Sequence, residues 1–192
     1  MDTHTDTDWA GDKASRKSIG CVNHQMDGCP IMSTVRQQSF LALSSAEAEL
    51  GGMLIGGTEG LAYRRLLEWL GFKVIWKLGT DSSAARGFAF KEGVGRMRHI
   101  DLKILWLQRA TATEGLNIYK VPGELNRANL GTKRLAQRQL EQEARMNGIL
   151  DISEVGRQSV PEVHAVERVG MRPDLATLEE LSMALLTYLR TA

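Results

Sequence analysis

The segment that decides the fold is THTDTDWAG, residues 3–11. Threonine alternates there with His4, Asp6 and Asp8, and this period of two predicts a β-strand. Both aspartates would then project from one face of the strand. We therefore expect a strand near the start of the sequence that carries carboxylates toward its end.

Two further strands are expected directly after it. Residues 18–25 (SIGCVNHQ) and 30–35 (PIMSTV) flank Asp27-Gly28, a dipeptide that tight hairpin turns favour because it tolerates positive φ. A strand through residues 39–44 (SFLALS) would complete an antiparallel meander.

A long helix is expected next. Ser44 and Glu47, three residues apart, form a capping-box pattern that begins a helix. The helix would run to Leu70 and end at Gly71. Five glycines between residues 51 and 60 would each cost about 1 kcal/mol relative to alanine. Close packing of this helix against a sheet is the expected compensation.

Strands and helices alternate in the remainder of the sequence. The pattern predicts a strand in 73–80, a short helix in 82–90 beginning at Ser82 or Ser83, a basic loop in 91–99, an amphipathic helix in 100–111, a strand in 116–122 and a charged helix in 126–148 that ends at Gly148. Antiparallel strands followed by such alternation indicate an α/β fold, with a mixed sheet and helices on its faces.

Acidic residues stand at the ends of these elements. Asp6 and Asp81 lie in or just after strands, and Glu47 and Glu49 lie in the first turns of the long helix. Carboxylates that fold onto one point repel each other unless cations bind, and Mg²⁺ prefers such hard oxygen ligands. The pattern suggests a metal-dependent nuclease. Two residues of helix amount to about 200° of rotation, so one glutamate faces the site, and helix geometry leaves open which.

Composition bounds the domain organisation. The 192 residues, 43% of them hydrophobic, suffice for one domain with a sizeable core and an appendage. We expect the domain in residues 1–148, a polar linker in 149–173 and an amphipathic helix in 174–192, where leucines recur at helical spacing after Asp174.

Cysteine usage and hydropathy predict the setting. The sequence has two cysteines, no stretch near the roughly 18 apolar residues of a membrane span, and a polar N-terminal segment unlike a signal peptide. We expect an intracellular, reduced location and no membrane partner. Residues 1–150 carry a net positive formal charge and 151–192 a net negative one, so the first part is suited to a polyanion.

Five sequence blocks identify a family resemblance. They are TDTDWAGDKASRKS (5–18), LALSSAEAEL (41–50), LGTDSSAA (78–85), GRMRHIDLKILWLQ (95–108) and YKVPGELNRANLGTKRL (119–135). In order and spacing they resemble the signature blocks of the ribonuclease H domain that ends copia-type (LTR) retrotransposon Pol polyproteins. The resemblance covers roughly residues 3–137. It implies the ribonuclease H-like fold, a five-stranded mixed sheet flanked by helices, and hydrolysis of the RNA strand of RNA/DNA hybrids.

The resemblance assigns the site residues position by position. The family's first aspartate falls on Asp6, its glutamate on Glu49, its third acid on Asp81, and its fourth, an aspartate in the family, on Asn129. Asp8 would then be a local hydrogen bonder, and Glu47 would cap the helix.

The resemblance also implies two Mg²⁺ ions, for which Mn²⁺ is a possible substitute, in an in-line hydrolysis. Asp6 would bridge both ions, Glu49 and Asp81 would each favour one, and Asn129 would touch the ion that activates water. The amide brings no negative charge, so weaker metal binding and impaired activity are expected.

Basic residues near the predicted site are candidates for phosphate contacts: Arg16 and Lys17 after the first strand, and Arg96, Arg98 and Lys103 in the fourth block. The implied partners are an RNA/DNA hybrid and the reverse transcriptase region of the same polyprotein, in a cytoplasmic or nuclear retroelement particle. The alternative is a catalytically inactive, retroelement-derived module that binds nucleic acid or protein. The sequence does not set the oligomeric state.

Overall fold

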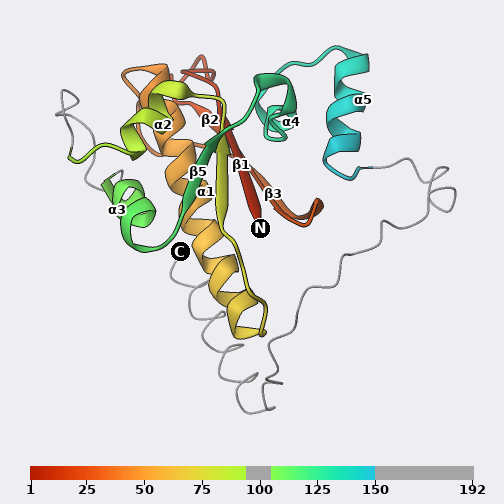
Figure 1. Ribbon diagram of the computed structural model, residues 1–192. Coiled ribbons are helices and arrows are strands. Elements are labelled where there is room, and N and C mark those ends of the chain that lie inside the picture. The colour runs from red at the N-terminus through yellow and green to blue at the C-terminus, as the bar shows by residue number, and fades with distance from the viewer. Residues whose placement is uncertain (94–104, 150–192) are drawn as a thin grey trace, which may run out of the picture.

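A computed structural model describes residues 1–93 and 105–149 (Figure 1). Arg96, Arg98 and Lys103, the helix predicted for 174–192, and all of the predicted linker except Ile149 lie outside the described residues. In chain order the elements are β1 (Asp2–Thr7), β2 (Ile19–Met26), β3 (Cys29–Gln37), α1 (Ser45–Trp69), β4 (Lys77–Thr80), α2 (Ser83–Ala89), α3 (Leu105–Thr113), β5 (Asn117–Lys120), the 3₁₀ turn η2 (Gly123–Leu125), α4 (Asn129–Thr132) and α5 (Gln137–Met146). No helix within these two described ranges is long and apolar enough to span a bilayer.

A five-stranded mixed sheet with strand order β3-β2-β1-β4-β5 forms the centre of the fold. Strand β1 pairs antiparallel with β2 and parallel with β4, β2 pairs antiparallel with β3, and β4 pairs parallel with β5. The predicted α/β architecture, a ribonuclease H-like mixed sheet with flanking helices, is confirmed. Because β1 and β4 are parallel neighbours, the residues that follow them emerge at the same end of the sheet.

The predicted hairpin is present, but the strand predicted for residues 39–44 is not. Asp27 and Gly28 adopt positive φ values of 49° and 81° between β2 and β3. After β3 the Gln38 N–H still bonds to Ser18 O at 2.8 Å, and the chain then leaves the sheet. Ala42 O in that segment accepts a hydrogen bond from Trp9 Nε1 at 3.1 Å, which connects it to the loop after β1.

Helix α1 begins and ends where the sequence predicts. Ser44 is the N-cap, and its hydroxyl accepts the Glu47 N–H at 3.2 Å. The Glu47 carboxylate reaches back to accept the Leu43 N–H at 2.8 Å. At the other end Gly71 takes a φ of 88°, the left-handed conformation that commonly ends a helix.

The glycines of α1 allow the helix to lie directly on the sheet. An added Cβ at Gly52 would stand 2.4 Å from Thr7 Oγ1, and one at Gly56 would stand 2.6 Å from Thr5 Cγ2. Real side chains do not approach so closely, so any larger residue would push α1 away from β1. The predicted close packing is confirmed, and it sets the distance between α1 and the central strand.

Helices cover both faces of the sheet (Figure 1). The threonines of β1 face α1, whereas Gly131 of α4 lies against Cys21 of β2 and Val35 of β3. Asp6 pairs with Cys21 in the sheet register, so the Asp6 side chain points to the α4 face. The apolar core lies on the α1 face, where Leu50, Met53, Trp76, Leu78 and Leu107 are almost fully buried.

The single helix predicted for residues 126–148 is wrong, because it is divided into α4 and α5. Lys133 and Ala136 are extended, with ψ values of 143° and 154°. The break leaves Thr132 directed at Asp6 of β1, and Lys133 directed at Asp6 and at Asp81, which directly follows β4. It also allows α5 to pack separately, with Asn147 Oδ1 accepting a bond from Asn23 Nδ2 of β2 at 2.7 Å. Gly148, with φ of 70°, follows α5 as predicted.

The fold predicts opposite effects for two helical glycine substitutions. Gly56→Ala should lower the free energy of unfolding by roughly 1–3 kcal/mol because the methyl group overpacks the α1–β1 contact. Gly87→Ala in α2, where an added Cβ meets nothing within 4 Å, should raise it by up to about 1 kcal/mol. Urea denaturation followed by circular dichroism measures both. Equal effects of the two substitutions would contradict the proposed packing role of Gly56.

Candidate active site

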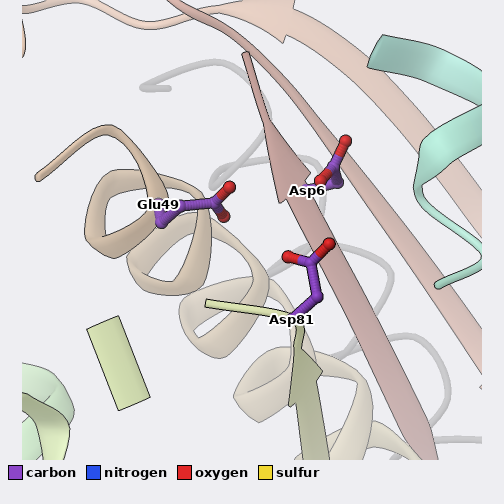
Figure 2. Close-up of side chains that lie close together, drawn as sticks. All are labelled: Asp6, Glu49 and Asp81. Atoms are coloured by element: carbon purple, nitrogen blue, oxygen red, sulfur yellow. The ribbon is translucent and has the colours of Figure 1, made fainter. Parts of the chain in front are cut away.

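Three carboxylates from three elements meet at the carboxyl ends of β1 and β4. Asp6 lies in β1, Glu49 in the second turn of α1, and Asp81 directly after β4. One carboxylate oxygen from each lies within 4.8 Å of the other two. Figure 2 shows the three side chains pointing toward one another. Among the described residues, this is the one group of His, Cys, Asp and Glu side chains that could hold a metal ion.

Local structure positions Asp81. The strand ends at Thr80, whose hydroxyl accepts the Ser82 N–H at 3.1 Å. Ser82 in turn caps α2 by accepting the Ala85 N–H at 3.2 Å. Asp81 is therefore held in a tight strand-to-helix connection, with its side chain 23% exposed.

Asp6 is almost completely buried, with 4% of its surface exposed. Its Oδ2 accepts a hydrogen bond from the Thr132 hydroxyl of α4, and its Oδ1 lies 3.6 Å from Lys133 Nζ. Burial raises the pKa of Asp6 above its ordinary value, while the Thr132 and Lys133 contacts oppose this shift.

At Glu49 the opposing contributions, from the Thr7 backbone and the Lys133 ammonium, are smaller than those that raise its pKa. Its Oε2 is buried and has no hydrogen-bond partner in the described part of the chain. Burial, followed by the negative charges of Asp6 and Asp81, raises the pKa of Glu49 to about 8. A carboxylate with an unpaired buried oxygen, placed beside two other carboxylates, is in an environment that a hard cation relieves. The residues therefore fit a divalent metal ion.

Asn129 lies next to this cluster but does not point its amide nitrogen into it. The side chain is buried, and its Nδ2 donates to Gly123 O at 2.7 Å and to Glu143 Oε1 of α5 at 3.1 Å. Its Oδ1 accepts a hydrogen bond from Lys133 Nζ. The amide is thus connected to the carboxylates through the lysine.

Lys133 and Thr132 were not predicted from the sequence as site residues. Lys133 Nζ stands 3.6 Å from Asp6 Oδ1 and 3.8 Å from Asp81 Oδ2. A signal was available in the sequence, because Lys133 lies four residues after Asn129 in the fifth block. One helical turn would place the two side chains on the same face.

The two neighbouring acids have other contacts. Asp8 lies beyond β1, where its Oδ1 accepts the Ile19 N–H at 2.6 Å. Glu47 bonds to the backbone at the start of α1. Of the basic residues predicted to contact phosphate, Arg16 is exposed and Lys17 half-buried in the loop between β1 and β2. That loop leaves β1 directly after Asp6 and Thr7.

The raised pKa of Glu49 predicts a pH-dependent stability for the metal-free domain. A carboxyl group whose pKa is higher in the folded state stabilises the fold while protonated, and this stabilisation is lost as the pH rises from about 4.5 through about 8. In EDTA, Glu49→Gln should therefore reduce the fall in Tm over this range. Burial lowers the pKa of His4, which gives Tm an opposite dependence on pH. The difference in Tm between the variant and the wild type therefore isolates the effect of Glu49.

Glu68→Gln, at an exposed position of α1, is the control. A Glu49→Gln profile parallel to that of the wild type would contradict the assignment.

Comparison with known proteins finds a sequence relative. The chain is 29% identical over 140 residues to the retrovirus-related Pol polyprotein from transposon TNT 1-94 of Nicotiana tabacum. The match covers 72% of this chain, and the chain spans about a tenth of the length of that relative. No protein-family model matches.

Among solved structures, the chain is similar to the N-terminal RNase H domain of rv2228c from Mycobacterium tuberculosis, solved as a fusion with maltose-binding protein. The TM-score is 0.45 at 15% identity, and the match covers 75% of this chain and 95% of that chain. The fold assignment itself rests on the strand order and directions of the sheet. The predicted resemblance is confirmed: the chain is similar in sequence to a transposon Pol polyprotein and has the ribonuclease H-like fold.

Proposed function

We propose that this chain is a metal-dependent ribonuclease H-type endonuclease that hydrolyses the RNA strand of RNA/DNA hybrids. The observation that carries the proposal is the meeting of Asp6, Glu49 and Asp81 within 4.8 Å of one another at the carboxyl ends of two parallel strands. Three acids at this distance repel one another, and structural roles for all three would not explain their convergence.

The carboxylates would hold Mg²⁺, or Mn²⁺ in its place. When bound, the metal supplies a water of lowered pKa and positive charge for the leaving oxygen. The protein contributes position: Asp6 is fixed by the Thr132 hydroxyl, Asp81 by the β4–α2 connection, and Glu49 by the close contact of α1 with β1. Rigid placement of all three from different elements allows the site to be formed before the substrate arrives.

Nucleic-acid contacts are proposed for the loop after β1. Arg16 and Lys17 lie in this loop, beside the end of the sheet at which the acids converge. Phosphate contacts by such side chains would position a hybrid without reading its sequence. The similarity to a Pol polyprotein supports a place in a retroelement polyprotein, with its reverse transcriptase region as the neighbouring partner.

One observation favours a second candidate function. Asn129 brings no charge to the site, and both hydrogens of its amide nitrogen face other acceptors, Gly123 O and Glu143. A catalytically inactive module that binds nucleic acid or protein would retain the fold while lacking a fourth acid. Binding of a hybrid without cleavage in either Mg²⁺ or Mn²⁺ would support this candidate and contradict the first.

Cleavage of a labelled RNA/DNA hybrid by the purified chain tests the proposal. Asp6→Asn and Glu49→Gln should each reduce the rate by at least about 100-fold, because each removes a charged metal ligand. Asp27→Asn, in the exposed turn between β2 and β3, and Glu47→Gln, at the helix cap, should cleave at nearly the wild-type rate. Loss of activity in Glu47→Gln with retention in Glu49→Gln would reverse the assignment of the two glutamates.

Restoring a fourth acid requires a second change. Asn129→Asp alone would place a carboxylate oxygen against Gly123 O and the buried Glu143, where the amide now donates two hydrogen bonds. Asn129→Asp with Glu143→Gln supplies a donor to the new carboxylate. We expect the double variant to cleave about tenfold faster than Asn129→Asp alone and to have a higher Tm. Equal rates and equal Tm values in the two variants would show that Glu143 does not restrict position 129.

A further inference from the structure

We propose that the ammonium group of Lys133 takes the place of one metal ion, so that the site binds a single divalent cation. This inference rests on the proposed function and concerns the same site. It replaces the two-ion arrangement implied by the family resemblance with one metal ion and one resident side-chain cation.

The contacts of Lys133 are those expected of a cation in the site. Its Nζ lies 3.6 Å from Asp6 Oδ1 and 3.8 Å from Asp81 Oδ2, and it donates to Asn129 Oδ1. These are three of the four residues that the resemblance assigns to the metal centre. Asn129 is the residue assigned to the ion that activates water, so the ammonium occupies that side of the site.

The opposite side of the site is left for a metal ion. Among the described residues Glu49 Oε2 is buried without a hydrogen-bond partner, and a carboxylate oxygen of Glu49 lies within 4.8 Å of oxygens of Asp6 and Asp81. A divalent ion between these three groups would satisfy it. Asp6 would then contact Lys133 on one side and the metal on the other.

Hydrogen bonds of Lys133 and of the residue before it hold Lys133 in this position. Its own N–H donates to Asn129 O at 2.9 Å, and the residue directly before it, Thr132, donates to Asp6. Lys133 is the first extended residue after α4, so its side chain leaves the helix end toward the carboxylates. Although 44% of the side chain is exposed, its ammonium group contacts three residues of the site.

Formal charge agrees with a single divalent ion. Three carboxylates and one ammonium sum to −2, which one divalent cation neutralises. With Lys133 replaced by a neutral residue the sum becomes −3. If Asn129 is also replaced by aspartate it becomes −4, the charge that matches two divalent ions.

Counting bound Mn²⁺ tests the inference independently of cleavage. Isothermal titration calorimetry, supported by electron paramagnetic resonance of free Mn²⁺, should give one ion per chain for the wild type, Lys133→Arg and the control Lys73→Met, whose lysine is exposed near the start of β4. Lys133→Met should bind its first ion about tenfold or more tightly because a competing positive charge is removed. The triple variant Asn129→Asp, Glu143→Gln, Lys133→Met should bind two ions.

Unfolding in EDTA verifies that the variants fold and adds a second readout. Lys133→Met should unfold at a lower temperature than Lys133→Arg and should regain more stability on addition of Mn²⁺, because its carboxylates lack a counterion. Two Mn²⁺ ions on the wild type, or unchanged Mn²⁺ affinity in Lys133→Met, would overturn the inference.

The outcomes separate this inference from the proposed function. If the wild type binds one ion and Lys133→Met behaves as expected, but no hybrid is cleaved, the nuclease proposal fails and the role of Lys133 stands. If the wild type cleaves the hybrid with two bound ions, the nuclease proposal stands and the role of Lys133 fails.

Discussion

The arrangement of this domain depends on how closely α1 approaches β1. Gly52 and Gly56 have no side chain at the contact, and Thr7 and Thr5 occupy the space that a Cβ would need. The same contact brings the first turns of α1 to the end of the sheet, where Glu49 meets Asp6. Glycines weaken an isolated helix, but here they allow the close contact that positions Glu49. Packing of α1 against the sheet offsets their conformational cost. Fold and site are determined together by this helix–strand distance.

Asp6 and Glu49 have very different environments within the same site. Asp6 has a hydroxyl and an ammonium as partners, whereas Glu49 has a buried oxygen with no partner in the described residues. Such an arrangement is destabilising in the absence of a cation, because desolvation and mutual repulsion both disfavour the charged form. The fold tolerates it because the strands and α1 hold the acids from three separate directions. A free-energy cost of this kind, from buried groups with shifted pKa values, is common at functional sites.

The sequence predicted much of the fold because its signals are local. The alternation through Asp6, the turn at Asp27-Gly28 and the cap at Ser44 each act over a few residues, and the structure has a strand, a hairpin and a helix start at these places. The divided C-terminal helix was missed because its break at Lys133 depends on acids more than fifty residues away. The pairing of Lys133 with distant carboxylates likewise leaves little trace in local pattern, and only its spacing of four residues from Asn129 points to the site. The choice of Glu49 over Glu47 likewise came from resemblance and not from helix geometry.

Helix α5 contributes no acid to the cluster, yet it is connected to it. Glu143 accepts from Asn129, while Asn147 bonds to Asn23 of β2 and donates to Arg127 O. A protease that cut the extended connection between α4 and α5 would leave every carboxylate of the cluster on the larger fragment. Release of α5 would nevertheless remove the acceptor that orients the Asn129 amide, and with it a restraint on the lysine beside the acids. Cleavage at this connection would thus change the site without removing any of its carboxylates.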